Sequence, residues 1–555
     1  MGRPLRAFGL VLLVGSGLLV SSRGGTAAQA GPTVSQNEAD EKGVVWTPPT
    51  SDRAARHALR RMHAMGATAV RLTRPLDGER VLATADTLGL ALYVDLPVAY
   101  LSARALADTA AFARRALDRV LAQSRRHSSL RAVGLARGAD TTTPSACAYL
   151  DTLARQVRAE SDLRTYYVTP FPPSADRCVP SVDAVLVDLV EATDPQGAFQ
   201  RWTEAAAAVG VGAVGHGVRP QAASGLRVPH SPERQARRLE QGLPRLLDDA
   251  SGAPVFVYRW QDRSAERTTR RYGLHSAGAT PRPAARVVAG LFTGRQTTFA
   301  LPRGTAPATG APWLVLVGWG LLAGLGMLST QYAQMRRTLP RYVLSHGFYR
   351  DDIRRGRDLM PEVNVVLLVG AVCALGIGAL VAARALAADP SVRHVLAALP
   401  DELRQVAARW IETPVTYGVE VGVGAGLLLC GWGAALSAAA RPWGGLSTSQ
   451  VLMLLAWPHW PAWVGLVAAL VLAAPGPGAY GGWAAAGLAA GGFGLAVWIV
   501  VRVLRDYAAV ASVPAPVAAL LALASPPAVV VFGSLGIVAY YDLPVRYLYH
   551  LLTLT

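Results

Sequence analysis

The sequence contains few charged residues and almost no lysine. Of its 555 residues only 16% are charged and 52% are hydrophobic, which is too little charge for an ordinary soluble protein. Lys42 is the only lysine, so the formal net charge of +17 comes from arginine. The arginines are dispersed or flank apolar runs, and no nucleic-acid-binding motif accompanies them. We therefore expect no nucleic-acid partner, and the composition favours a membrane protein.

Cysteine is also scarce, and its spacing excludes the common zinc signatures. Cys373 and Cys430 lie in apolar runs, where a small buried thiol needs no special role. Cys147 and Cys178 lie in the part of the chain before Pro312. No metal site is expected from these positions. In an oxidising compartment Cys147 and Cys178 could form a disulfide, and the sequence leaves that pairing open.

The N-terminus has the pattern of an export signal. Arg3 and Arg6 precede an apolar run from Phe8 to Val20, and the small-residue site Ala28-Gln29-Ala30 follows. These are the three parts of a cleaved signal peptide, which we predict over 1–30. The alternative is an uncleaved anchor helix, for which the run is short. Both interpretations place the following residues outside the cytoplasm.

Long apolar runs after Pro312 predict a polytopic all-α membrane domain over 312–555, joined through a linker at 301–311. The loop from Gln334 to Asp358 carries seven arginines, which marks its side of the membrane as cytoplasmic. The segment from Ala388 to Thr413 and the C-terminal Val545 to Thr555 are then expected outside, and the former is predicted as an amphipathic surface helix. About six spanning helices are predicted, over 312–332, 362–387, 414–438, 449–473, 480–502 and 512–540.

Few ionisable residues interrupt these runs. Glu420 lies near a helix end, and His459 lies in a proline-broken aromatic segment, so packing roles are favoured over an ion or proton site. Glycines such as Gly422 and Gly426 permit close helix packing. A basic segment followed by five packed helices loosely resembles Yip1-like membrane domains. A transport or assembly role of the helices remains one functional hypothesis.

Before the linker, short apolar strands alternate with amphipathic helices. The near-continuous apolar strands indicate a parallel sheet that is buried on both faces. The count of eight, within about 250 residues, predicts an α/β fold of the (β/α)8 TIM-barrel type over 31–300. An open doubly wound sheet is the alternative, but no G-x-G-x-x-G follows the first strand, so no dinucleotide cofactor is expected. The predicted strands cover 43–47, 67–72, 91–96, 130–136, 165–169, 183–189, 211–215 and 254–258.

Candidate functional residues follow the carboxyl ends of these strands, where TIM barrels carry their chemistry. Aromatic, charged and hydroxyl-binding groups at such a mouth are typical of a sugar site, and arginine forks match carboxylates. Rim salt bridges are the simpler interpretation of any single position. The candidates are Trp46, Arg71, Arg74, Asp95, Arg137, Asp140, Asp188, Glu191, His216, Arg259, Trp260 and Asp262.

An ordered series of segments resembles the clan-A glycoside hydrolases, especially the family 2 β-galactosidase and β-glucuronidase barrels. The family's N-A-V-R strand, its passage into strand three and its H-P-S-I segment each have a counterpart here. The matching segments are A-T-A-V-R-L at 67–72, A-D-T-L-G-L-A-L-Y-V-D at 85–95, H-S-S-L at 127–130, D-A-V-L-V-D at 183–188, A-P-V-F-V at 253–257, Y-G-L at 272–274 and P-R-P-A at 281–284.

This sequence departs from the family pattern at the two catalytic positions. Where the family has its acid/base glutamate this sequence has Gly138, after Arg137, and the nucleophile position corresponds to Arg259. Neither residue can protonate a leaving group or attack an anomeric carbon. The resemblance therefore implies a non-catalytic, membrane-tethered barrel that binds an acidic glycan or an envelope protein on the outer side of the cytoplasmic membrane. An active membrane-bound hydrolase that uses Asp140 and Asp262 is the alternative.

Overall fold

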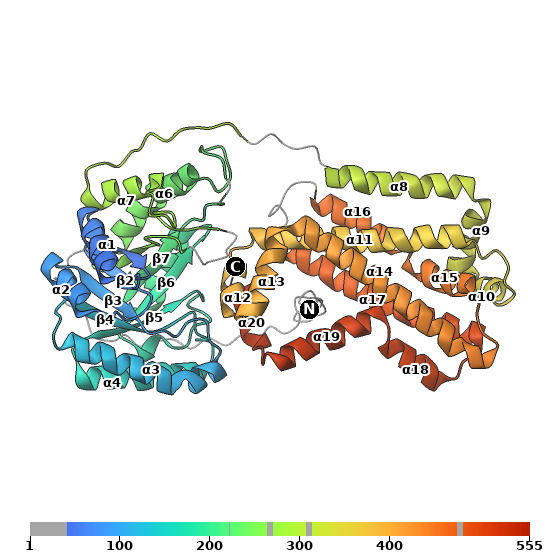
Figure 1. The fold of residues 1–555 in the computed structure, drawn as a ribbon, viewed down its shortest axis with the longest axis horizontal. Helices are drawn as coiled ribbons and strands as arrows, with labels where there is room; N and C mark the ends of the chain where they lie inside the picture. The colour runs from blue at the N-terminus through green and yellow to red at the C-terminus, as the bar shows by residue number, and fades with distance from the viewer. Residues whose placement is uncertain (1–40, 221, 264–269, 307–312, 474–480, 555) are drawn as a thin grey trace. The chain divides into compact units, whose positions relative to one another are not determined.

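The computed structural model describes residues 41–220, 222–263, 270–306, 313–473 and 481–554 (Figure 1). The signal peptide predicted over 1–30 lies outside them. The chain divides into two compact units, one built around a β-barrel and one built from helices. The barrel unit comprises residues 23–308 together with two later segments, Arg393–Ala398 and Arg546–Thr555.

The barrel is a closed ring of parallel strands in sequence order, which confirms the predicted (β/α)8 fold and excludes the open doubly wound sheet. β8 pairs with β1, as in the register Phe256 to Gly43, so the described strands leave no sheet edge. The strands are β1 (Lys42–Trp46), β2 (Ala69–Leu72), β3 (Ala91–Asp95), β4 (Leu130–Arg137), β5 (Arg164–Thr169), β6 (Ala184–Val190), β7 (Val209–Gly215) and β8 (Val255–Tyr258).

Amphipathic helices surround this ring. In α1 the residues Ala55, Leu59 and Met62 are buried, as their helical spacing predicts, and the Ser51 side chain caps the first turn. Full burial of a leucine or methionine stabilises the fold by roughly 1.5–3 kcal/mol. The helices are α1 (Asp52–Ala64), α2 (Glu79–Leu88), α3 (Ala103–Ser124), α4 (Pro144–Glu160), α5 (Pro195–Ala205), α6 (Pro232–Asp249) and α7 (Pro283–Thr293).

The two late segments of the barrel unit are short helices, α12 (Val392–Ala398) and α20 (Val545–Leu552). Phe171, which follows β5, forms a small apolar core with Tyr547 and Leu551 of α20. Val395 of α12 packs against the same core. Segments far apart in the sequence thereby become part of the barrel unit.

The second unit is a helical bundle with long apolar helices. Four helices are long and apolar enough to cross a membrane, and the pair α18–α19, bent by 54°, makes a fifth candidate span. The sequence predicts about six, and the remaining run, 480–502, extends beyond the residues that the structure describes. The helices of this unit are α8 (Trp313–Gln331), α9 (Ala333–Leu344), α10 (His346–Arg354), α11 (Pro361–Ala388), α13 (Asp401–Glu412), α14 (Pro414–Ala440), α15 (Thr448–Ala456), α16 (Ala462–Ala473), α17 (Gly481–Ala511), α18 (Ala515–Leu523) and α19 (Pro526–Tyr540).

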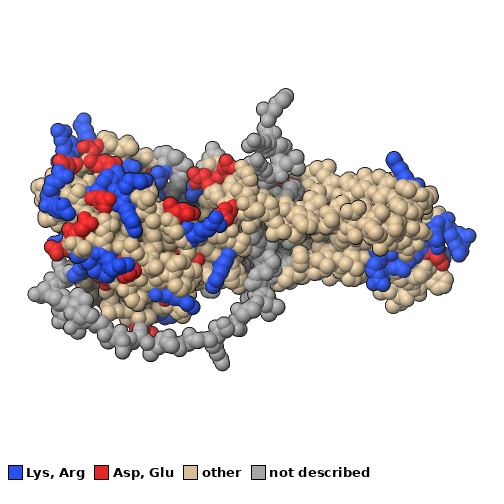
Figure 2. All heavy atoms as spheres, turned by 90° about the horizontal axis from the view of Figure 1, so that it is seen from below, with Lys and Arg blue, Asp and Glu red and all other residues tan. Residues whose placement is uncertain are grey.

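Glycine lets two of these helices approach closely. A Cβ built on Gly376 of α11 would lie 2.7 Å from the Gly418 carbonyl oxygen of α14, and the reverse distance is the same. Any larger residue would separate the two backbones at this crossing. The face of the helical unit seen in Figure 2 carries few charged side chains along its length, and basic side chains gather at the end where Figure 1 places α9 and α10.

Candidate ligand-binding site at the barrel mouth

A cleft of about 800 Å³ opens at the carboxyl ends of β8, β1 and β2, which are neighbours in the closed ring. Five arginines line it, from α1 and from the ends of three strands. Arg61 comes from α1, Arg74 follows β2, and Arg137 ends β4, while two more follow β8. The predicted site residues that the cleft brings together are Trp46, Arg74, Arg137, Arg259, Trp260 and Asp262.

The cleft is strongly basic because its acidic residue is already engaged. Asp262 is the only carboxylate among the described residues that line it. The Asp262 side chain is fully buried, and its Oδ2 accepts a hydrogen bond from Arg282 at 2.5 Å. Its Oδ1 accepts from the Gly273 amide at 2.8 Å and lies 3.6 Å from the Arg259 guanidinium. Among the described lining residues, no further carboxylate stands beside the other arginines.

Arg61 is held in place against the cleft wall. Its guanidinium lies 5.5 Å from the centroid of the Trp260 ring and 2.7 Å from His275 Nε2. Because His275 Nδ1 donates to the Trp260 carbonyl at 3.1 Å, Nε2 is the acceptor for Arg61. Trp46 and Trp260 are each only 3% exposed. Both rings line the cleft but offer little free face for stacking against a ligand.

Arg137 borders both this cleft and the rest of the mouth. Its guanidinium lies 5.6 Å from the centroid of the Tyr100 ring. Its Nε is buried without a hydrogen-bond partner in the described structure. A buried donor of this kind costs free energy unless a ligand or water accepts from it.

The chain itself occupies the side of the mouth formed by β3 to β6. Arg393 of α12 donates to Asp188 Oδ1, at the end of β6, over 2.8 Å. Burial acts to raise the pKa of Asp188, but the nearby charge of Arg393 prevails and lowers this pKa to about 2. Burial together with the charge of Arg393 lowers the pKa of His394 to about 3, so His394 is neutral beside Tyr100 Oη, 3.1 Å away.

Gly138, where the glycosidase resemblance expects a glutamate, has no room for a side chain. Its φ is +60°, and a Cβ built there would lie 2.6 Å from the Tyr100 ring. The Tyr547 hydroxyl of α20 donates to the Gly138 carbonyl. Next to it, Asp140 accepts from Thr142 at 2.6 Å and lies 3.9 Å from His550 of α20. The second late segment thus covers the predicted acid/base position.

Arg71 and Asp95 lie inside the barrel and do not line the cleft. Arg71 is 1% exposed, and its fork donates to both carboxylate oxygens of Asp95 at 3.0 and 2.6 Å. It also donates to the Gly212 carbonyl at 2.7 Å, while Tyr166 donates to Asp95 at 2.7 Å. This saturated network ties β2, β3, β5 and β7 together, which favours a structural role.

His216 and Glu191 lie at the ends of β7 and β6, away from the cleft lining. Burial lowers the pKa of His216 to about 4. Its Nδ1 is buried without a partner in the described structure. Glu191 accepts from the Gly217 amide at 2.7 Å and lies 3.2 Å from Arg270. Within the part of the chain that the structure describes, no cluster of His, Cys, Asp and Glu could hold a metal ion.

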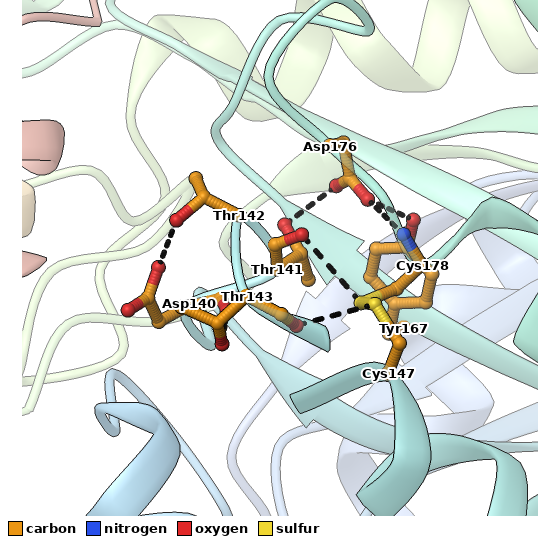
Figure 3. Close-up of a disulfide and its surroundings, with 8 residues drawn as sticks. All are labelled: Asp140, Thr141, Thr142, Thr143, Cys147, Tyr167, Asp176 and Cys178. Atoms are coloured by element: carbon orange, nitrogen blue, oxygen red, sulfur yellow. Dashed lines mark hydrogen bonds between the residues drawn. A yellow bond between two sulfur atoms is a disulfide. The ribbon is translucent and has the colours of Figure 1, made fainter. Parts of the chain in front are cut away.

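A disulfide joins Cys147, at the start of α4, to Cys178, in the loop after β5 (Figure 3). Asp176 lies beside it and accepts from the Thr141 hydroxyl at 2.7 Å and the Tyr167 hydroxyl at 2.8 Å. The Thr141 contact ties the loop that carries Asp140 to the segment after β5, and the disulfide ties the start of α4 to the same segment.

Sequence reasoning missed several residues of the mouth. Arg61 and Arg263 line the cleft, but Arg61 lies on a helix and not at a strand end. The residues of α12 and α20 are separated from the barrel in the sequence by candidate membrane-spanning helices, so no local pattern points to the mouth. The predicted membrane topology was the one signal for these contacts, because it placed the barrel and the segments around α12 and α20 on the same side of the membrane.

Glu420 and His459, the two ionisable residues noted in the apolar runs, have local partners in the helical unit. Glu420 accepts from Arg409 at 2.5 Å and from Trp410 Nε1 at 3.1 Å, which joins α13 to α14. His459 Nδ1 lies 2.6 Å from the Leu455 carbonyl of its own helical turn. Both contacts agree with the packing roles expected from the sequence.

No protein-family model and no curated protein sequence matches the chain. Among solved structures, it is similar to the GH2 beta-galacturonidase from Eisenbergiella tayi bound to galacturonate, with 16% identity and a TM-score of 0.42, over 47% of this chain and 52% of that one. A beta-glucuronidase from uncultured Clostridium sp. matches with 14% identity and a TM-score of 0.41, over 46% and 50%. The b-glucuronidase from Ruminococcus gnavus in complex with D-glucaro 1,5-lactone matches with 15% identity and a TM-score of 0.40, over 45% and 49%.

The chain thus spans about half the length of the structures that it matches. The assignment of a (β/α)8 barrel rests on the closed parallel sheet itself.

Proposed function

We propose that this protein is a membrane-tethered, non-catalytic, glycoside-hydrolase-like barrel that binds an acidic glycan outside the cytoplasmic membrane. The observation that carries the proposal is the arginine-lined cleft, in which the only described carboxylate is already engaged. Guanidinium groups bind carboxylates and phosphates through paired, charge-assisted hydrogen bonds. A cleft of about 800 Å³ is within the range of small-ligand sites.

The state of the carboxyl groups supports the proposed absence of catalysis. Retaining glycosidases need two carboxyl groups about 5–5.5 Å apart, and inverting enzymes need them about 6.5–9.5 Å apart. Position 138 cannot hold one, because its Cβ would collide with Tyr100. Asp262 is buried against Arg282, and Asp188 is paired with Arg393, which lowers its pKa. A general acid needs a raised pKa, so the Arg393 contact works against proton donation by Asp188.

Predicted membrane topology supports the outer location. The sequence expects the barrel, the segment 388–413 and the C-terminal residues 545–555 on the same side of the membrane. Parts of both later segments belong to the compact unit of the barrel. A shared side is required for that arrangement, so the fold is consistent with the orientation indicated by the arginine-rich loop.

Glycan binding by the full-length protein in lipid nanodiscs tests the proposal. Arg74→Gln with Arg263→Gln removes two exposed cleft charges, while Arg53→Gln with Arg60→Gln removes two exposed charges of α1 outside the cleft lining. We expect an acidic oligosaccharide such as oligogalacturonate to bind and its neutral counterpart to bind weakly. An exposed charge contact is worth up to about 1 kcal/mol, or roughly fivefold in affinity, per arginine.

The cleft variant should therefore bind the acidic sugar several-fold more weakly, and the α1 variant should bind it like the parent. Equal binding by both variants, or no binding of any acidic glycan, would overturn the assignment of the cleft.

A further inference from the structure

The helices that follow the first spanning helix expose an unusual combination of side chains. α9 and α10, residues 333–354, are called the basic hairpin here. Their exposed apolar side chains are Leu339 (42% exposed), Val343 (56%), Leu344 (82%) and Phe348 (69%). Water-facing surfaces rarely gather such groups, whereas helices lying in a membrane interface do.

Exposed arginines accompany this apolar face. Arg336 and Arg337 precede it on α9, and further exposed arginines follow at the end of α10 and in the next turn. Figure 2 shows basic side chains gathered at this end of the helical unit. Two of the nearby acids are engaged, because Arg341 lies 3.0 Å from Asp352 and 3.8 Å from Asp358. The exposed arginines are Arg336, Arg337, Arg354, Arg355 and Arg357.

The basic hairpin is mounted firmly on the bundle. Asp506 of α17, which is fully buried, accepts from Arg350 at 2.9 Å and lies 2.7 Å from His346 Nε2. The Tyr349 hydroxyl donates to the Met453 carbonyl at 3.0 Å, and Gln450 donates to the Ile353 carbonyl at 2.7 Å. These contacts fix which face of the hairpin packs inward, so its exposed apolar and basic groups are a consequence of the fold.

Donors without partners lie just beneath this surface. The hydroxyl of Tyr342 and the Nε1 of Trp457 are buried without a hydrogen-bond partner in the described structure, and their rings lie 6.1 Å apart. The Arg502 guanidinium lies 5.3 Å from the centroid of the Tyr342 ring. The Arg502 Nε and Asp506 Oδ2 are also unpartnered but lie 3.8 Å apart, so a small shift satisfies both. The Trp457 Nε1 still requires an acceptor.

We infer that the basic hairpin binds the phosphate headgroup of anionic phospholipids. The arginines supply charge-assisted hydrogen bonds to phosphate oxygens, and Leu339, Leu344 and Phe348 contact the upper part of the acyl chains. Direct continuity with the spanning helix α8 brings the hairpin to headgroup depth. This lipid site is separate from the barrel cleft, and its test does not depend on the glycan.

The experiment uses the full-length protein reconstituted in phosphatidylcholine vesicles with spin-labelled phosphatidylglycerol or spin-labelled phosphatidylcholine as probes. The motionally restricted fraction of each probe reports its relative affinity. We expect a clear preference for phosphatidylglycerol. Arg336→Gln with Arg337→Gln should reduce that preference by up to roughly fivefold per arginine. Arg336→Lys with Arg337→Lys should retain most of it, and Arg53→Gln with Arg60→Gln on the barrel should leave it unchanged.

Three outcomes would overturn the inference. They are equal restriction of the two lipids by the parent protein, an equal preference in the Gln variant, and loss of the preference when free inorganic phosphate is added. The last result would assign the site to soluble phosphate. Variants that retain the parent's glycan binding show that the barrel is intact.

Discussion

Breaking the Arg393–Asp188 pair should release α12 from the barrel mouth. The pair joins the end of β6 to α12 over 2.8 Å, and the side chains are 21% and 7% exposed. Arg393→Gln leaves Asp188 charged and largely buried with no cation beside it. Asp188→Asn leaves Arg393 in the corresponding state. The double change should therefore cost less free energy than the sum of the two single changes.

The magnitude follows from the pKa of Asp188, which is lowered from 3.8 to about 2. At 1.36 kcal/mol per pKa unit, a shift of this size corresponds to roughly 2–3 kcal/mol of favourable interaction with the charged carboxylate. This agrees with the low end of the 3–5 kcal/mol typical of one-sided removal from a buried pair, because Arg393 keeps some contact with water. The stabilisation is complete above about pH 4 and is lost as the pH falls through about 2.

Amide hydrogen exchange of α12 in the full-length protein measures the opening free energy of this segment. We expect a coupling of about 2 kcal/mol from the double-mutant cycle of Arg393→Gln and Asp188→Asn at neutral pH. The exposed Arg155–Asp151 pair of α4 is the matched control, and its cycle should give below about 0.5 kcal/mol. A coupling at Asp188 no larger than at the control would refute the proposed anchoring.

Three further predictions concern the barrel unit. Gly138→Ala should lower its stability by at least ~2 kcal/mol in thermal unfolding, because φ is +60° and the new Cβ meets Tyr100; an unchanged melting temperature would contradict this. Cys147→Ser with Cys178→Ser should lower the free energy of unfolding by about 3–4 kcal/mol, because the disulfide closes a loop with a sequence separation of 31. Reductant should destabilise the parent protein and leave this variant unchanged. The pKa of His394 is lowered from 6.5 to about 3, so the docking of α12 should weaken by about 1.4 kcal/mol for each pH unit below 6.5. His394→Gln should flatten this pH profile, and pH-independent docking in the parent protein would rule the prediction out.

The barrel was predictable because its signal is local. Parallel strands buried on both faces give short runs of apolar residues, and eight such runs alternate with helices such as α1, whose buried residues recur at helical spacing. The cleft was partly predictable for the same reason, since strand ends converge at one face of a TIM barrel. Arg74, Arg137 and Arg259 therefore meet in it as expected.

The features of the mouth that the sequence did not indicate depend on distant parts of the chain or on side-chain direction. Arg71 and Asp95 belong to strand ends in the sequence, yet their side chains point into the barrel and pair with each other. Asp188 is paired with Arg393, which is 205 residues away in the sequence. No periodicity encodes such a pairing, because it depends on where the intervening long apolar helices return the chain.

The helical unit shows the limits of counting apolar runs. Composition located every helix that passes the length and apolarity criteria in the described residues, including Pro361–Ala388. It could not foresee the 54° bend between α18 and α19, which depends on the break near Ser525 and Pro526. It also gave no indication that Asp506 would be buried beside three basic side chains at the base of the basic hairpin.

Binding without cleavage is the central claim, and a single sample can test it. Full-length protein in nanodiscs is incubated with an acidic oligosaccharide that it binds, and the anomeric proton signals of the sugar are followed by NMR. The account predicts saturable binding that depends on Arg74 and Arg263, with no new reducing-end signal over time. New reducing ends that disappear in Asp140→Asn or Asp262→Asn would contradict it and show an active hydrolase.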